Sequence, residues 1–165
     1  MDDKDRKMEA LRKDVFSATV NRGLVYTAIL REMRKELGNE RATEIFKRAI
    51  HNHGLNMAKF LNPPHAIEEF KAWLLAFLPD GGAMHEPEVL HSDEKGLDIK
   101  FRRCPLKEGW RMVGLSRDEV ADMCKHADAF DHGFFGGMFE YSMDLWTEQS
   151  DDSCILHFRP KAEQG

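Results

Sequence analysis

The sequence has no apolar run near the ~20 residues that a membrane-spanning helix needs, and it has no excess of basic residues. Its 24 Lys and Arg against 29 Asp and Glu give a net charge of −5, whereas nucleic-acid-binding domains usually carry a basic face. Residues 1–7 are mostly charged and lead into no hydrophobic signal region. We therefore expect a cytoplasmic protein that binds neither a membrane nor nucleic acid.

Cysteine is scarce, and the common nucleotide and serine-hydrolase motifs are absent. The three cysteines are Cys104, Cys124 and Cys154, an odd number that cannot all pair within the chain. Cytoplasmic thiols are also normally reduced. The sequence contains no Gly-x-Gly-x-x-Gly, no P-loop and no Gly-x-Ser-x-Gly elbow. These absences disfavour a disulfide framework, nucleotide chemistry and serine hydrolysis.

The first half of the chain has the pattern of helices. Residues 3 to about 37 contain no proline, and their apolar residues recur at helical spacing, with Gly23 as a candidate kink. A second helix follows from about residue 39 and ends at Asn62-Pro63-Pro64. A third begins at Pro64 and ends before the turn at 79–82.

The second half has short alternating runs that predict strands. Glu88–Ser92 and Leu97–Arg103 predict one hairpin, and Phe139–Thr147 and Cys154–Arg159 predict another. Between them, Ser116-Arg117-Asp118-Glu119 is a capping box that begins another helix. This order predicts an α+β fold, with N-terminal helices packed on an antiparallel sheet built from two C-terminal hairpins with an intervening helix.

Cys104 is a candidate functional residue at the end of a predicted strand. Alternation places it on the polar face of that strand together with Arg102, and Pro105 ends the strand after it. A thiol there suits an exposed functional position, and an unimportant cysteine at a surface edge fits equally well. Cys154, by contrast, alternates with apolar neighbours, which predicts a place in the core.

A second group of chemical side chains lies on the predicted helix that follows the capping box. Cys124 and Asp128 are four residues apart and share a helix face, which Asp131 and His132 continue. A thiolate beside an imidazolium could act as a nucleophile, and the same groups could ligate zinc. His126 is only two residues from Cys124 and points roughly away from it. The simpler alternative is that Cys124 is a small core residue, as free cysteines often are.

The chain contains a series of short motifs in a defined order. They are Leu37-Gly38-Asn39-Glu40-Arg41-Ala42, Arg48-Ala49, His53-Gly54, Cys104-Pro105, Trp110, Gly114-Leu115, Cys124, Asp128, Phe134, Glu140 and Asp151-Asp152-Ser153-Cys154. This order resembles the L-2-amino-thiazoline-4-carboxylic acid hydrolase family. The resemblance covers about residues 25–160, within a single domain of 1–165. It implies a hydrolase-like domain over 25–160 and a helical N-terminal extension over 1–24.

The resemblance implies a hydrolase that acts on carbon–nitrogen bonds of a small cyclic amidine. The family's reaction opens a cyclic isothiourea to give N-carbamoyl-L-cysteine. By position, Cys104 or Cys124 would be the nucleophile or would orient the attacking water. Asp128 would be the general base or its orienting partner, and His126 is a further acid–base candidate.

The resemblance also suggests which residues hold the substrate. A cation must bind the substrate carboxylate, and Arg102 or Arg103 could supply it. Trp110 and Glu140 are further substrate-binding candidates. The sequence requires no cofactor, although a divalent metal could bind at Cys124, Asp128 and His132.

Two other functions remain open from the sequence. The same scaffold could be a non-catalytic sensor domain that binds a small molecule or a metal through its cysteines. It could also be an interaction domain, because the long first helix suits a homodimer formed through the N-terminal helices. The first question for the structure is whether Cys104, Cys124 and Asp128 meet in one cavity.

Overall fold

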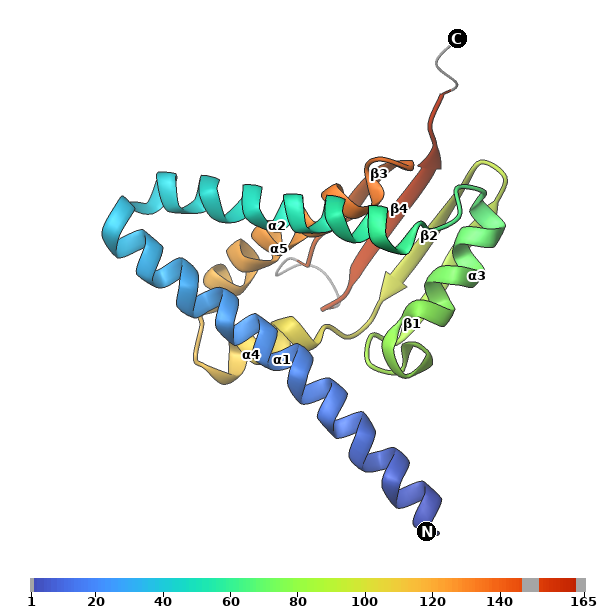
Figure 1. The fold of residues 1–165 in the computed structure, drawn as a ribbon, viewed down its shortest axis with the longest axis horizontal. Helices are drawn as coiled ribbons and strands as arrows, with labels where there is room; N and C mark the ends of the chain where they lie inside the picture. Colours follow the sequence, from blue (N-terminus) through green and yellow to red (C-terminus); the bar gives the residue numbers. More distant parts are fainter. Residues whose placement is uncertain (1, 147–151, 163–165) are drawn as a thin grey trace.

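A computed structural model describes residues 2–146 and 152–162. It has a long helical arm, three further helices beside a sheet, and a short helix between sheet and arm (Figure 1). The helices are α1 (Asp3–Leu37), α2 (Asn39–Leu61), α3 (Ile67–Phe77), the 3-10 turn η1 (Pro79–Gly82), α4 (Pro105–Met112) and α5 (Arg117–Phe135). The strands are β1 (Pro87–Asp93), β2 (Gly96–Phe101), β3 (Phe139–Asp144) and β4 (Cys154–Pro160).

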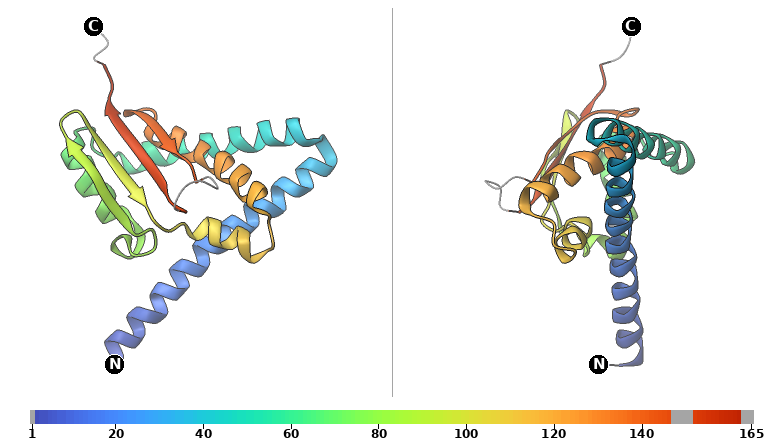
Figure 2. Two further views of the ribbon diagram at one scale, coloured as in Figure 1. Left: turned by 180° about the vertical axis from the view of Figure 1, so that it is seen from behind. Right: turned by 90° about the vertical axis from the view of Figure 1, so that its left-hand side faces the viewer.

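The four strands form one antiparallel sheet in the order β1-β2-β4-β3. The two predicted hairpins therefore lie side by side, joined where Leu97 of β2 pairs with Phe158 of β4. Helices α3 and α5 pack against one face of the sheet (Figure 2). That face is apolar, with Leu97, Ile99, Leu156 and Phe158 all buried. The predicted α+β fold is confirmed.

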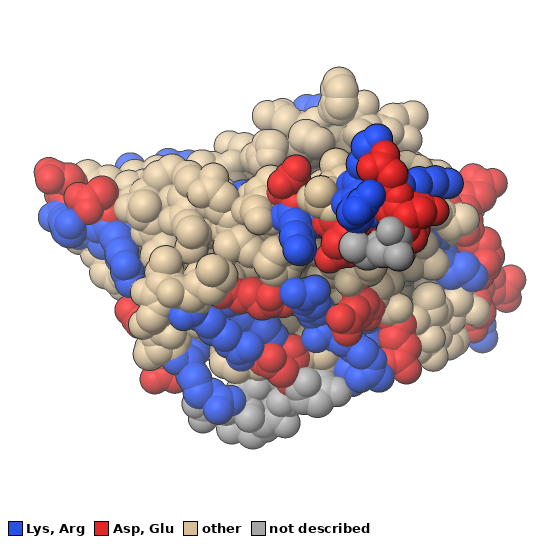
Figure 3. Space-filling model, turned by 90° about the horizontal axis from the view of Figure 1, so that it is seen from below, with Lys and Arg blue, Asp and Glu red and all other residues tan. Residues whose placement is uncertain are grey.

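The opposite face of the sheet is polar. Asp98 of β2 accepts hydrogen bonds from Arg159 at 2.7 and 3.1 Å, and its Oδ1 lies 2.8 Å from Nδ1 of His157. The strand alternation seen in the sequence thus separates a core face from a charged face. On the molecular surface seen from below, acidic and basic side chains are interleaved (Figure 3). Among the described helices, none is long and apolar enough to cross a membrane.

Two buried glycines bring α2 and α5 into backbone contact. A β-carbon at Gly54 would lie 2.2 Å from the carbonyl oxygen of Phe130, and one at Gly133 would lie 2.1 Å from the carbonyl oxygen of His51. Real β-carbons do not approach other atoms so closely, so only glycine fits at either position. This contact fixes α5, and with it the side chains that α5 directs away from α2.

Helix α1 is continuous through Gly23, so the helix is not broken at the candidate kink. Gly23 instead allows α4 to approach: Trp110 Nε1 donates a hydrogen bond of 3.0 Å to the Gly23 carbonyl. The first turns of α1 project from the body of the molecule and expose Met8 and Leu11 (Figures 1 and 2). A homodimer formed through this region stays a prediction.

The expected strand Leu97–Arg103 is too long, because β2 ends at Phe101. Pro105 also occupies the first turn of α4. The sequence pattern did not predict this helix. The capping box of α5 is confirmed, with Ser116 and Glu119 exchanging hydrogen bonds. The third predicted strand, Phe139–Thr147, ends at Asp144, and Thr147 lies outside the described residues.

Candidate functional site

A cavity of about 190 Å³ lies where α1, α4 and α5 meet one end of the sheet. A dry protein cavity of ~150 Å³ can hold benzene, so this one suits a ligand somewhat larger than benzene. Its wall is mostly apolar, with Phe101 and Leu156 from the sheet and Trp110 from α4. Charged side chains and thiols are set into that wall, which is the usual composition of a small-molecule site.

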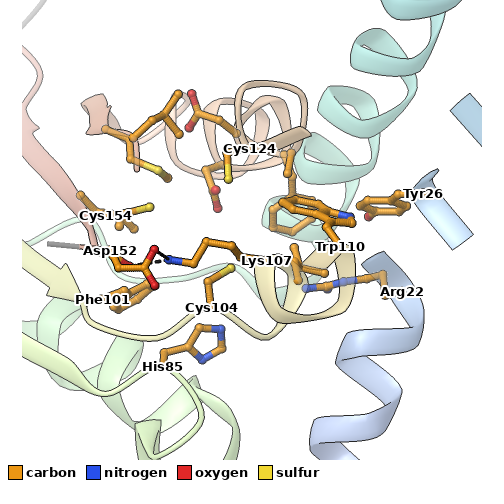
Figure 4. A pocket seen from close by; sticks show the side chains of 18 residues that line it. Arg22, Tyr26, His85, Phe101, Cys104, Lys107, Trp110, Cys124, Asp152 and Cys154 are labelled. Atoms are coloured by element: carbon orange, nitrogen blue, oxygen red, sulfur yellow. Dashed lines mark hydrogen bonds and ion pairs between the residues drawn. The ribbon is translucent and has the colours of Figure 1, made fainter. Parts of the chain in front are cut away.

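All three cysteines line this cavity. Cys104 directly precedes α4, Cys124 lies on α5, and Cys154 begins β4. Figure 4 shows their sulfur atoms turned toward the same space, and all three are free thiols. Cys154 packs against both hydrophobic clusters, as expected for a core residue, but it also lines the cavity. It lies on the apolar face of the sheet, but at the end where that face becomes the cavity wall.

The expected polar-face position of Cys104 is corrected. The chain leaves the sheet after Phe101, so strand alternation does not extend to residue 104. The half-buried Cys104 turns into the cavity instead. Burial raises the pKa of its thiol, although the backbone N–H group and the ammonium of Lys107, and the N–H of Leu106, oppose that rise.

The thiols that line the cavity are protonated near neutral pH. Burial raises the pKa of Cys124 far above its ordinary value, and it raises that of Cys154 to about 11. The neighbouring sulfur of Cys104 adds to both rises. His126 is not placed to activate one of these thiols, because it does not line the cavity.

Two carboxyl groups of α5 also line the cavity, in unlike surroundings. Burial, and then the nearby Asp128, raise the pKa of Asp131 to about 8. Burial also raises the pKa of Asp128, but His132 and Tyr141 oppose that rise. His132 Nε2 lies 3.2 Å from one Asp128 oxygen, and the Tyr141 hydroxyl donates to the other at 3.2 Å. Asp131 is thus a neutral acid at pH 7, next to a better-stabilised carboxylate.

This environment predicts a pH-dependent contribution of Asp131 to stability. Folding raises its pKa from 3.8 to about 8, so the folded protein holds the proton more tightly than the unfolded chain. The contribution is complete below about pH 4, falls by about 1.4 kcal/mol per pH unit, and is lost above about pH 8. Urea unfolding of the parent and of Asp131→Asn should show this slope in the difference of their unfolding free energies. A difference independent of pH between 5 and 8 would contradict the assignment.

Lys107 is a buried cation that the sequence did not predict as a site residue. Its Nζ donates to the Asp152 backbone carbonyl and lies 3.0 Å from the Asp152 carboxylate. Arg111 binds the same carboxylate through two hydrogen bonds of 2.7 and 3.0 Å. The pKa of Asp152 is consequently about 2. Lys107 could have been found from Pro105, because proline often occupies the first turn of a helix.

Arg22 and His85 were also missed. Arg22 reaches the cavity from α1, and His85 lies on the chain between η1 and β1. Burial lowers the pKa of His85 to about 4, and the Arg22 guanidinium contributes to this effect. The only sequence signal for Arg22 is indirect: it shares a helix face with Tyr26, which also lines the cavity.

Of the three remaining predicted site residues, one lines the cavity and two do not. Trp110 forms part of the wall. His126 lies on α5 but does not line the cavity; its Nε2 is 3.0 Å from Asp122 and 3.3 Å from a nitrogen of Arg34. Glu140 is exposed on β3 and does not line the cavity.

The two arginines expected to hold a carboxylate are engaged elsewhere. Arg102 is half-exposed and pairs with Glu88 of β1. Arg103 binds Glu108 through hydrogen bonds of 2.6 and 3.1 Å, and its guanidinium lies over the ring of Phe16. Neither side chain lines the cavity.

A metal site at Cys124, Asp128 and His132 gains no support from the geometry. Within residues 2–146 and 152–162, no group of three or more His, Cys, Asp or Glu side chains is arranged to hold a metal ion. Both Asp128 oxygens are instead in contact with His132 or Tyr141.

Comparison with known proteins agrees with the family suggested by the sequence motifs. Among solved structures, the chain is similar to the phenol-responsive sensory domain of the transcription activator PoxR, crystallised with phenol. The identity is 16% and the TM-score 0.47, over 86% of this chain and 74% of that one. No curated protein matches the chain. The family model for L-2-amino-thiazoline-4-carboxylic acid hydrolase matches residues 18–158, and the chain therefore belongs to this family.

Proposed function

We propose that this protein is a hydrolase that opens the ring of a small cyclic amidine, such as L-2-amino-thiazoline-4-carboxylate, in the cavity of α4, α5 and the sheet. The observation that carries the proposal is the pair Asp128 and Asp131. Two carboxyl groups held in unlike environments at one cavity are the usual arrangement for a general base and a general acid. Family membership and a cavity somewhat larger than one that holds benzene support the same substrate class.

The atoms of this reaction determine which bond must break. Water adds to the amidine carbon of the ring, and the carbon then carries oxygen, two nitrogens and sulfur. The product N-carbamoyl-L-cysteine keeps both carbon–nitrogen bonds, so the carbon–sulfur bond breaks and the sulfur leaves with a proton. Although cyclic amidine hydrolysis is grouped with carbon–nitrogen chemistry, the ring of this substrate opens at sulfur.

Each step has a candidate residue in the cavity. Asp128 takes a proton from the attacking water, and Asp131 supplies a proton to the substrate as the ring opens. Cys104 and Cys124 orient the water rather than attack the ring, because their raised pKa values keep them protonated near neutral pH. The cysteines thus serve as weak hydrogen-bonding groups beside the reacting carbon.

The test is turnover of L-2-amino-thiazoline-4-carboxylate by the purified protein, with N-carbamoyl-L-cysteine detected by mass spectrometry. We expect product from the parent, a lower rate from Cys104→Ala and Cys124→Ala, and partial retention in Cys104→Ser, because a hydroxyl can still orient water. Ser142→Ala, at an exposed position of β3, is the control. Complete loss of activity in Cys104→Ser, together with a covalent adduct in the parent, would identify Cys104 instead of water as the nucleophile.

A non-catalytic sensor remains the second candidate, favoured by the mostly apolar wall and the protonated thiols. Such a domain would bind the same class of ligand without consuming it. Saturable binding of L-2-amino-thiazoline-4-carboxylate with the ligand recovered unchanged would favour the sensor and contradict the hydrolase.

A further inference from the structure

Arg22 is a cation that lines the cavity without a hydrogen bond or ion pair among the described residues, although its charge acts on the nearby Asp131 and His85. It extends from α1 toward the middle of the cavity (Figure 4). No hydrogen bond or ion pair links it to any other residue in the described ranges. The other cation that lines the cavity, Lys107, is bound to Asp152. The Arg22 charge is therefore available to a ligand.

His85 supplies a second unsatisfied group beside Arg22. Its Nδ1 is shielded from solvent and has no hydrogen-bond partner among the described residues. The ring packs at 5.3 Å from that of Phe101, which orients it in the wall below Cys104 (Figure 4). Since a buried ring nitrogen without a partner is costly, a ligand atom that bonds to it would restore a lost interaction.

We propose that Arg22 and His85 form an anion subsite that binds the carboxylate of a small ligand, so that the cavity selects carboxylate-bearing molecules over neutral ones of the same shape. The side chain of Arg22 lines the cavity and is exposed, so an entering carboxylate can pair with it. A guanidinium binds a carboxylate through two parallel hydrogen bonds. A neutral imidazole with its proton on Nδ1 donates a third.

The subsite also fixes which end of the ligand meets α5. A molecule whose carboxylate is held at Arg22 also faces the carboxyl groups of Asp128 and Asp131, because they line the same cavity and Arg22 is near enough to act on Asp131. Those groups favour a basic or cationic group. The ligand class is therefore a small molecule that carries both a carboxylate and a basic nitrogen, and the identification of that nitrogen as an amidine rests on the proposed function.

The experiment measures binding with two probes that contain no amidine and cannot undergo the proposed ring opening. L-thiazolidine-4-carboxylate and thiazolidine differ by the carboxylate, and each is titrated calorimetrically into the full-length parent, Arg22→Gln, Arg22→Lys and Arg6→Gln. Arg6 is an exposed arginine of the same helix, outside the cavity. We expect the parent and Arg6→Gln to bind the carboxylate probe at least tenfold more tightly than thiazolidine. Arg22→Gln should lose this preference, and Arg22→Lys should keep part of it.

Equal binding of the two probes by the parent, binding of neither, or an unchanged preference in Arg22→Gln would overturn the subsite. These outcomes are separate from those that test the hydrolase. A protein that prefers the carboxylate probe through Arg22 but turns over no cyclic amidine keeps the subsite and loses the proposed reaction. A protein that hydrolyses 2-amino-thiazoline as fast as its 4-carboxylate, with Arg22→Gln unaffected, keeps the reaction and loses the subsite.

Discussion

Replacing Gly133 with alanine should destabilise the protein by about 3 kcal/mol or more, as in severe overpacking of a core. Alanine is the better helix former by about 1 kcal/mol, so helix propensity alone predicts the opposite sign. The steric effect prevails because the new methyl group would lie 2.1 Å from the carbonyl oxygen of His51. That oxygen belongs to the backbone of α2, which cannot move without separating the two helices.

The measurement is urea-induced unfolding followed by circular dichroism, with Gly137→Ala as the matched control. Gly137 lies in the turn just after α5, and a β-carbon there would meet nothing within 4 Å. We expect the control to change the unfolding free energy by no more than about 0.5 kcal/mol. Gly54→Ala should resemble Gly133→Ala, since its β-carbon would meet the Phe130 carbonyl oxygen at 2.2 Å. Equal midpoints for Gly133→Ala and Gly137→Ala would refute the backbone contact between α2 and α5.

Asp131→Asn should lower kcat/KM for ring opening by about 10²–10⁴-fold, the usual contribution of a general acid or base. Asparagine keeps the shape of the side chain but cannot transfer the proton. The parent should also lose activity as the pH rises through about 8, where Asp131 ionises, and this decline should be absent from the residual activity of the variant. Both effects are measured from initial rates between pH 6 and 9.5.

Asp118→Asn is the control for this substitution. Asp118 lies in the first turn of the same helix, is exposed and does not line the cavity. It should leave kcat/KM unchanged. The stability of Asp131→Asn at pH 7 and above should be no lower than that of the parent, because the substitution removes a buried group that resists ionisation. Parent-like kcat/KM in Asp131→Asn would exclude Asp131 as the acid.

The helices and strands were predictable because their signals are local. The capping box of Ser116 and Glu119 marks the start of α5, and alternation along Leu97–Phe101 separates the two faces of the sheet. Helix α4 was missed because Pro105 fits two patterns, the end of a strand and the first turn of a helix. Only the packing of Trp110 against α1 decides between them.

The composition of the site was less predictable, because it depends on contacts distant in sequence. Cys124 and Asp128 could be paired from helical spacing alone. The turn of the chain after Phe101 brings Cys104 to the same cavity, and no local pattern indicates that turn. Alternation placed Cys154 correctly on the apolar face, but it cannot distinguish a closed core from a cavity wall. Arg22 is one of several arginines of α1, and only the fold shows which of them faces a cavity.

The close approach of α1 and α4 limits how short a fragment of the chain could still form the site. Gly23 accepts the Trp110 hydrogen bond, and Arg22 lines the cavity, so a cut at residue 24 would remove part of the wall along with the proposed N-terminal extension. Residues 2–14 are exposed along their whole length, whereas Val20 is buried against Gly109 of α4. The smallest unit able to build the cavity therefore begins between these two stretches, inside a continuous helix rather than at a loop.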